Sequence, residues 1–443
     1  MKLGRRGAAF RGRVPPRGLL ALGLAMLVLS LAPWSRLAGA ETTTPAVQRS
    51  ASDDAIARWT ERAKVSPDDR EAWVSLGDAF MQKARESADP GYYRRAEAAY
   101  QKALASGPPP VGALAGLAWV HGALHDFEQS AEWARKALKI DPGYGAAHGL
   151  LGDAALEMGD YDAAFEHYQK MLDIRPDLAS YSRGAQLLWV TGDTRKAVWL
   201  MEKAVKAGAP YAENTAWARA QLALMLWSQG ALLSAEQTLE AAREATPRNP
   251  HVLATMARVK TARGDYAAAI DYYQRAIAVV PRLETVIALG AIYAVTGQTA
   301  ETAKQYALVE AINRLNRASG IRDDLDMLKF YADHDRNLGQ AVEEAEAVFR
   351  TRKNVYAADT LAWCYYKAGR YEEARKVIRK ALARRSPDAE ILFHAGMIHA
   401  KLGDRAHAQK YLYQALSLDP HFHPVHATTA AATLAELGAR PAE

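Results

Sequence analysis

Histidine is concentrated near the end of this 443-residue chain, where six of the twelve histidines follow residue 390. The run His421-Phe-His423-Pro-Val-His426 could place imidazole nitrogens close enough together to bind a transition metal. The same residues could instead pack against the last structural unit or cap a final helix, with Pro424 in its first turn. We favour packing and capping, and therefore predict no metal site. The six histidines are His394, His399, His407, His421, His423 and His426.

A second group with suitable residue types is Asp333-His334-Asp335, which could supply an acid and a base. It falls where a turn between two helices is expected, so a turn or helix-capping role is favoured. The sequence contains no phosphate loop, GxSxG, HExxH or dinucleotide-binding glycine set. Its one cysteine, Cys364, permits no intrachain disulfide. We therefore predict that the chain is not an enzyme, has no catalytic residues and needs no cofactor.

Helices must position these residues, because the chain repeats a helical hairpin pattern. Residues 145–176 contain two amphipathic helical patterns around the turn at residues 158–161, and they end in a proline. Near-copies on both sides bring the total to ten units. Small residues at fixed positions let the two backbones approach, and large residues fill the space between them. A glycine permits the left-handed turn, and the final proline stops the second helix. The sequence therefore predicts an all-α array rather than one globular core.

The array departs from regularity at its start and in its middle. A half unit with Ala55, Trp59 and Pro67 comes first, and an insertion falls at the turn near residues 86–91. The second helix of the seventh unit runs long, to about Ala318. The predicted division is a signal peptide at 1–40, a flexible linker at 41–52, the half unit and units one to seven at 53–310, an irregular region at 311–354, and the last units with a capping helix at 355–438.

The pattern resembles the tetratricopeptide repeat family, whose units are about 34 residues long. Gly152, Gly159, Ala164, Tyr168 and Pro176 of the third unit carry it, and the resemblance covers nearly all of residues 53–438. It implies an α-solenoid, a superhelix of antiparallel helix pairs that binds proteins in a concave groove lined by first helices. The segments at 331–334, 361–363, 393–398 and 421–422 are also similar to a group of bacterial exported repeat proteins.

Aromatic residues recur at the positions of the first helices that should face the concave side. Such residues are typical anchors of binding sites. Crowding in the superhelix could instead bury some of them as core. The Lys/Asn set with which some family members clamp a terminal carboxylate is not evident, so an apolar, aromatic groove is expected. The predicted groove residues are Trp119, Trp189, Trp217, Trp227, Tyr356, Trp363, Tyr366 and Phe393, with Met397 at an equivalent position.

The first 40 residues have the three parts of a secretory signal peptide. A basic segment precedes an apolar run at residues 18–32, and Ala38-Gly39-Ala40 provides small residues for cleavage before Glu41. The apolar run is short for a transmembrane helix. We predict export to the periplasm or beyond, with no membrane span after cleavage. The alternative is an inner-membrane protein anchored by an uncleaved signal, since residues 33–36 interrupt the approach to the cleavage site.

The net charge of +6 does not indicate nucleic-acid binding. Seven of the 56 basic residues lie in residues 1–40, and the remaining 49 face 50 acidic ones. The favoured function is a non-enzymatic scaffold in the bacterial cell envelope that binds a peptide or a partner domain. The alternative is an envelope assembly component that handles an exported polysaccharide, with aromatic side chains stacking on sugars.

Overall fold

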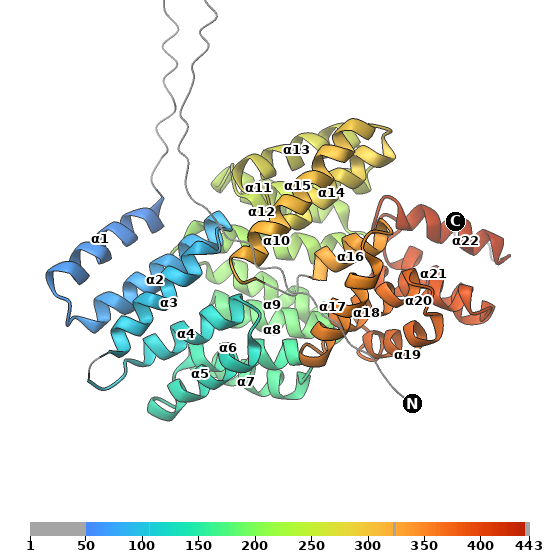
Figure 1. Ribbon diagram of the computed structural model, residues 1–443. Helices are drawn as coiled ribbons and strands as arrows, with labels where there is room; N and C mark the ends of the chain where they lie inside the picture. Colours follow the sequence, from blue (N-terminus) through green and yellow to red (C-terminus); the bar gives the residue numbers. More distant parts are fainter. Residues whose placement is uncertain (1–49, 106, 322–324, 439–443) are drawn as a thin grey trace, which may run out of the picture. The chain divides into compact units, whose positions relative to one another are not determined.

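The structure is a computed structural model, which describes residues 50–105, 107–321 and 325–438 (Figure 1). All regular elements within these residues are α-helices, and those from α2 to α21 form ten hairpins. The predicted signal peptide and most of the predicted linker lie outside the described residues. Helix α1 begins at Ala51, so it includes the last two residues of that linker.

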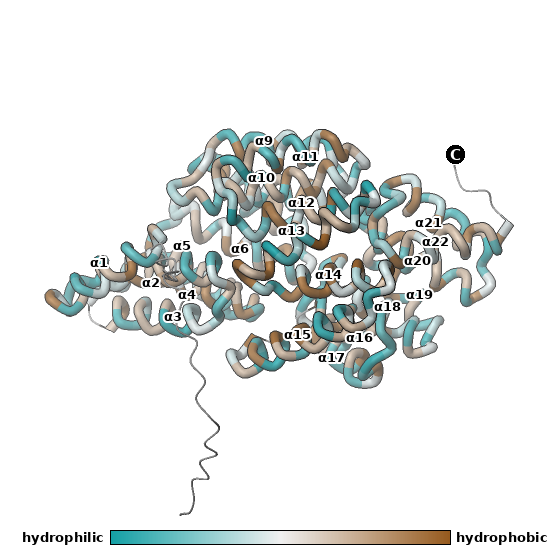
Figure 2. The backbone as a smooth tube through the Cα atoms, turned by 90° about the horizontal axis from the view of Figure 1, so that it is seen from above, coloured by the Kyte–Doolittle hydropathy of each residue, from teal (hydrophilic) through white to brown (hydrophobic). Residues whose placement is uncertain are grey.

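Helix α1 packs on the first hairpin, as expected for a half unit, and each hairpin then packs on the next. Figure 2 shows hydrophobic and hydrophilic residues alternating along most helices, as amphipathic helices require. The helices up to the fifth hairpin are α1 Ala51–Val65, α2 Arg70–Ser87, α3 Gly91–Leu104, α4 Val111–Ala123, α5 Phe127–Ile140, α6 Gly145–Met158, α7 Tyr161–Ile174, α8 Leu178–Val190, α9 Thr194–Ala207, α10 Ala212–Trp227 and α11 Leu232–Ala245.

The remaining hairpins include the irregular region and end at α22, which packs on the last hairpin as the predicted capping helix should. Their helices are α12 Pro250–Ala262, α13 Tyr266–Val279, α14 Leu283–Val295, α15 Thr299–Ala318, α16 Leu325–Asp333, α17 Leu338–Thr351, α18 Val355–Lys367, α19 Tyr371–Leu382, α20 Ala389–Lys401, α21 Arg405–Leu418 and α22 His426–Glu436.

The turn within a hairpin depends on a left-handed residue followed by a helix cap. In the third hairpin Gly159 has φ of 82°, and the Asp160 side chain then accepts a hydrogen bond from the N–H of Ala163. In the second hairpin His125 takes the left-handed place, with φ of 64°, before the capping residue Asp126. Local sequence therefore fixes where each second helix begins.

Close contact between the two helices of a hairpin depends on the predicted small residues. A Cβ atom added at Gly152 would lie 2.3 Å from Cε1 of Tyr168. One added at Gly290 would lie 2.6 Å from Cε1 of Tyr306. The aromatic ring of the second helix thus lies directly on the backbone of the first, as the pattern predicts.

The irregular places have simple structural explanations. The insertion near residues 86–91 extends α2 to 18 residues. Helix α15 runs for 20 residues and ends at Ala318, as predicted. In the eighth hairpin, Asp335 and Asn337 adopt left-handed φ values of 51° and 47°, which produces a different turn between α16 and α17.

Hairpins far apart in the sequence also contact one another. Glu157 on α6 accepts hydrogen bonds from Arg352 Nη2 at 2.9 Å and Asn354 Nδ2 at 2.7 Å. The Tyr161 hydroxyl accepts one from the N–H of Val355 at 3.0 Å. The third hairpin is therefore joined to the start of α18. No helix in the described part of the chain combines the length and apolar character needed to cross a bilayer.

Candidate functional site

Five consecutive first helices, α2, α4, α6, α8 and α10, are the main lining of a cavity of about 830 Å³, here called the N-terminal groove. Two of the predicted aromatic residues line it, Trp119 on α4 and Trp217 on α10. Both are half-buried, with their remaining surface available to a ligand. Leu150 and Leu156 on α6 add apolar surface between them.

The charged side chains of the N-terminal groove balance one another. Arg183 donates to Asp153 through Nε and Nη2, both at 2.9 Å, and Asp153 offsets the effect of burial to raise the pKa of Arg183. Asp78 accepts a hydrogen bond from the Tyr100 hydroxyl at 2.8 Å, and burial raises the pKa of its carboxyl. With Arg85 also in the lining, the groove contains two acidic and two basic residues.

Polar groups without partners lie on the lining of the N-terminal groove and beside it. Oδ1 of Asn214 is buried and has no hydrogen-bond partner, and the same holds for Nε1 of Trp227. Because an unpaired buried polar group is costly, these atoms are suited to bonding a ligand. Gln186 and Gln221 line both the groove and a smaller cavity of about 240 Å³, so the two cavities adjoin.

The smaller cavity contains three further predicted residues, Trp189, Trp227 and Tyr356. Trp189 is only 8% exposed, whereas Trp227 and Tyr356 are half-buried. Tyr356 comes from α18, so this cavity combines elements from both halves of the array. The structure thus brings five of the eight predicted residues to two adjoining cavities.

The other three predicted residues pack together in the C-terminal hairpins. Trp363 is 4% exposed and stacks on Tyr366, with ring centroids 4.7 Å apart. Its indole N–H donates to Asp333 Oδ1 at 2.7 Å. Phe393 is 1% exposed, and its ring lies 5.7 Å from that of Trp363. In this structure Trp363 and Phe393 present almost no surface to a ligand.

The run brings two imidazoles together, since the rings of His423 and His426 stack with centroids 4.2 Å apart, but His421 and His423 do not join a group of metal-ligand atoms. His423 Nδ1 accepts hydrogen bonds from the N–H groups of Val425 and His426, both at 3.2 Å, so His423 caps the start of α22. His421 uses its backbone N–H to bond the Asp419 carboxylate at 2.8 Å. Of the run, only His426 takes part in a group of ligand atoms within 4.8 Å of one another, together with Glu390 and His394.

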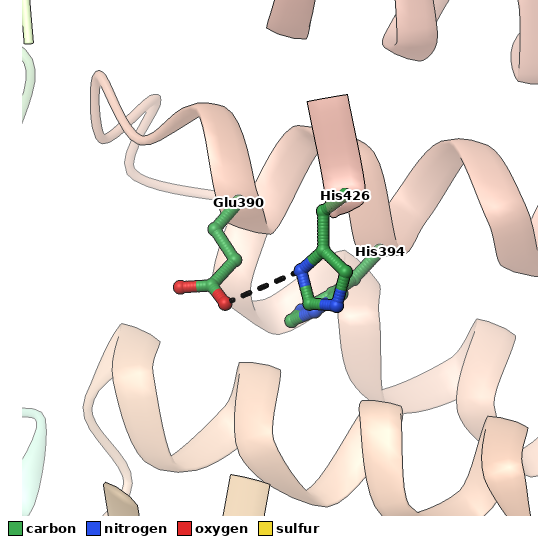
Figure 3. A group of neighbouring side chains, drawn as sticks. All are labelled: Glu390, His394 and His426. Atoms are coloured by element: carbon green, nitrogen blue, oxygen red, sulfur yellow. Dashed lines mark ion pairs between the residues drawn. The ribbon is translucent and has the colours of Figure 1, made fainter. Parts of the chain in front are cut away.

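Glu390, His394 and His426 form what we call the C-terminal cluster (Figure 3). Glu390 and His394 are four residues apart on α20 and share one face, and His426 reaches them from α22. The i, i+4 spacing of Glu390 and His394 was the available sequence signal, but it is common in helices. The sequence analysis named both His394 and His426 among the C-terminal histidines, but it did not pair them and it missed Glu390.

Carboxylates control the charge of the C-terminal cluster. Burial would lower the pKa of His426, but Asp333 and Glu390 outweigh it and raise that pKa to about 9. Burial would raise the pKa of Glu390, but Lys329 and His426 hold it well below its usual range. His426 lowers the pKa of Asp333 to about 2 against the opposing effect of burial.

The Asp333-His334-Asp335 group is divided among separate contacts around its turn. His334 Nε2 lies 2.7 Å from the Tyr306 hydroxyl, and its Nδ1 lies 2.8 Å from the Phe330 carbonyl oxygen. Asp335 pairs with Lys367 Nζ at 3.0 Å. This arrangement agrees with the predicted turn role.

Comparisons with known proteins find repeats of one family in three parts of the hairpin array. One tetratricopeptide repeat family model matches residues 83–145, 116–179 and 360–421, and a second matches residues 252–287. The small glutamine-rich tetratricopeptide repeat-containing protein 2 of Saccharomyces cerevisiae is 31% identical over 116 residues, or 26% of this chain. That match spans 33% of the yeast protein.

Matches to solved structures have low TM-scores. The structure of PilF from Pseudomonas aeruginosa has a TM-score of 0.38 and 19% identity, with 50% of this chain and 97% of PilF covered. PilW, described as a type IV pilus biogenesis factor, has a TM-score of 0.38 and 21% identity over 46% of this chain and 94% of its own. The Cut9–Hcn1 structure has a TM-score of 0.39 and 12% identity, with 87% of this chain and 93% of the matched chain covered. The family matches, together with the repeated hairpins, establish that this chain is a tetratricopeptide repeat protein.

Proposed function

We propose that this chain is a scaffold that binds an extended segment of a partner protein in the N-terminal groove. Tetratricopeptide repeat proteins bind protein partners and are generally scaffolds rather than enzymes. The observation that carries the proposal is the cavity of about 830 Å³ lined mainly by five consecutive first helices, with Trp119 and Trp217 on its surface. Half-buried tryptophans in such a cavity are suited to act as binding anchors.

The chemistry of the N-terminal groove favours an uncharged, partly aromatic segment. Its two acidic and two basic side chains balance, so no net charge selects an acidic or a basic partner. The unpaired Oδ1 of Asn214 can accept a hydrogen bond from the backbone of an extended peptide, and Gln186 and Gln221 carry further amides on the lining. Aromatic or branched aliphatic side chains of the peptide would fill the space between Trp119 and Trp217.

The predicted residues contribute unequally in this proposal. Trp119 and Trp217 are the main anchors, and Trp227 and Tyr356 extend the site into the adjoining cavity. Trp189 also lines that cavity but is mostly buried. Trp363, Tyr366 and Phe393 line neither cavity, so we propose that they support the fold of the C-terminal hairpins.

Selection from a displayed peptide library against the full chain tests the proposal. Enriched peptides should contain aromatic or branched aliphatic residues, and their Kd can be measured by fluorescence anisotropy. Trp119→Ala and Trp217→Ala should each weaken binding about 5-fold or more, because an anchor contributes over about 1 kcal/mol. Thermal melts of each variant would separate lost binding from lost folding.

Trp199→Ala is the matched control for these two variants. Trp199 lies on α9 and is 54% exposed, and it is outside the lining of the groove. Its removal should leave the Kd unchanged. Equal peptide affinity in Trp217→Ala, Trp119→Ala and Trp199→Ala would contradict the proposed site.

The polysaccharide alternative has no support from the comparisons, and the same reagents test it. Failure to select any peptide, combined with binding to a glycan array that Trp217→Ala abolishes, would favour a sugar polymer as the ligand.

We also propose that the chain acts in the cell envelope after export. The support is the signal-peptide pattern in residues 1–40. Mass spectrometry of the N-terminus of protein isolated from its native cells should find Glu41 first. An intact basic segment ahead of the apolar run would instead favour the uncleaved anchor.

A further inference from the structure

The C-terminal cluster brings together three side chains whose types suit a metal ion. One ring nitrogen each from His394 and His426 and a carboxylate oxygen of Glu390 lie within 4.8 Å of one another (Figure 3). His394 is fully buried, and His426 is 7% exposed. Glu390 lines the cavity of about 240 Å³ and also a second one of about 160 Å³, so it is accessible to small ions.

A separate carboxylate contacts one nitrogen of each histidine. Asp359 Oδ1 lies 2.8 Å from His394 Nδ1, and Asp333 Oδ1 lies 3.4 Å from His426 Nε2. The remaining nitrogen of His426, Nδ1, lies 3.7 Å from Glu390 Oε1. Metal-binding histidines usually have this arrangement, in which a carboxylate orients one nitrogen and the other binds the ion.

The remaining nitrogens, Nε2 of His394 and Nδ1 of His426, are both buried without a hydrogen-bond partner, and that of His394 has no ion pair either. A salt-bridge network would account for His426, which lies between Asp333 and Glu390. It would leave Nε2 of His394 unpaired, and a buried unpaired nitrogen of this kind calls for a ligand.

The charge around the cluster also favours a cation. The carboxylates of Asp333, Asp359 and Glu390 face the two histidines, and Lys329 Nζ is the basic group beside them, 3.6 Å from Glu390 Oε2. Three acidic groups therefore face two basic ones, Lys329 and the protonated His426, and a bound ion would replace the His426 proton. Rings of Trp363 and Phe393 stack on His394 and His426 and restrict their movement.

We propose that Glu390, His394 and His426 bind one divalent first-row transition metal ion, with zinc the best match. Two imidazoles and one carboxylate are a common zinc ligand set, and they leave a fourth position for water. His394 would bind through Nε2 and His426 through Nδ1, while Asp359 and Asp333 keep their contacts with the other nitrogens. The ion would tie α22 to α20 and so fasten the capping helix to the last hairpin.

Titration of the full chain with ZnCl₂ tests the proposal, using untagged protein that has been treated with a chelator. Calorimetry should show one Zn²⁺ bound per chain, and saturating Zn²⁺ should raise the Tm. Replacing zinc with Co²⁺ should give the visible absorption of a four-coordinate site. A protein that binds no Zn²⁺ under these conditions would overturn the proposal.

Two conservative variants locate the ion. His394→Asn keeps a donor near Asp359 and removes Nε2, and Glu390→Gln keeps the size of the side chain. Each should weaken Zn²⁺ binding at least about 100-fold, because even outer partners of a metal site contribute 10- to 100-fold. Asp359→Asn should therefore cost about 10-fold. Unchanged affinity in Glu390→Gln would overturn the proposal even if His394→Asn failed to fold.

A second histidine group provides the matched control. His399, Asp404 and His407 also lie within 4.8 Å of one another, but Asp404 caps α21 and His407 is exposed. His407→Asn should leave zinc affinity and the zinc-dependent rise in Tm unchanged. If His407→Asn lost zinc binding and Glu390→Gln kept it, the ion would lie at the His399, Asp404 and His407 group, and the proposal would be refuted.

Discussion

Aromatic residues occupy similar positions on the first helices of the N-terminal and C-terminal hairpins, but they meet different surroundings. Trp119 and Trp217 are half-buried on the wall of the N-terminal groove. Trp363 and Phe393 are covered by one another, by buried histidines and by α22. An aromatic residue on a first helix therefore indicates a binding surface only where no later element covers that helix.

The largest expected effect separates these two classes of aromatic residue. Trp363→Ala removes a buried ring that stacks on His394 and donates to Asp333, so it should lower the free energy of unfolding by about 3–5 kcal/mol. Trp217→Ala should cost much less, because its ring already lines a cavity. Chemical denaturation measures both. If both variants lost the same free energy of unfolding, Trp217 would be as much a part of the core as Trp363, and the contrast between the two regions would fail.

The framework of the groove can be tested through the contact between α6 and α7. Gly152→Leu places a side chain against the Tyr168 ring, where even a Cβ atom would be 2.3 Å away. We expect a loss near the upper end of roughly 1–3 kcal/mol, the usual cost of overpacking.

Gly339→Ala is the control, since Gly339 lies in α17 with no atom near its added Cβ. It should be neutral or stabilising by up to about 1 kcal/mol. A thermal melt unaffected by Gly152→Leu would mean that the repeat register is wrong.

The region between the groove and the C-terminal hairpins contains a half-buried histidine, His251, that should make the stability of the fold fall in acid. Burial, reinforced by Arg282 and Arg85, lowers the pKa of His251 to about 3, with Glu213 3.9 Å away. The unfolded chain takes up this proton near pH 6.5 and the folded chain does not, so stability falls as the pH drops below 6.5. At pH 5 the loss should be about 2 kcal/mol.

His251→Gln removes this titration, while every other titratable group is the same in the variant and the wild type. The difference in free energy of unfolding between the variant and the wild type should therefore shift by about 2 kcal/mol, in favour of the variant, between pH 7.5 and pH 5. If the difference in free energy of unfolding were the same at pH 7.5 and pH 5, His251 would be protonated at pH 5 in the folded protein, and its pKa would not be lowered.

Local patterns explain why most of the fold could be predicted. The glycine and proline positions specify where each helix ends, and residues such as Gly152 and Tyr168 specify how two helices touch. The half unit, the long α15 and the capping helix follow from the same reasoning. The insertion near residues 86–91 was expected in the hairpin turn, but its residues instead lengthen α2, which ends at Ser87 and leaves a short connection to α3.

Contacts between distant hairpins could not be predicted from these patterns. The pairing of Glu157 with Arg352 depends on small rotations summed over several repeats, and no local signal encodes that sum. The coverage of Trp363 and the meeting of His426 with His394 depend on where α22 lies. Groove residues in the first five hairpins could be predicted from the repeat pattern of neighbouring units. The C-terminal cluster could not be predicted without the three-dimensional position of α22.

The smallest predicted effect concerns the contact that joins the two regions. The Tyr161 hydroxyl accepts a hydrogen bond from the buried N–H of Val355 at the start of α18. Tyr161→Phe leaves that N–H unpaired and should lower the free energy of unfolding by about 1 kcal/mol. Tyr413→Phe, at an exposed site, should have no effect. Hydrogen exchange should show faster exchange at Val355 in Tyr161→Phe. If exchange there is unchanged, the groove and the C-terminal hairpins are stabilised independently of this contact.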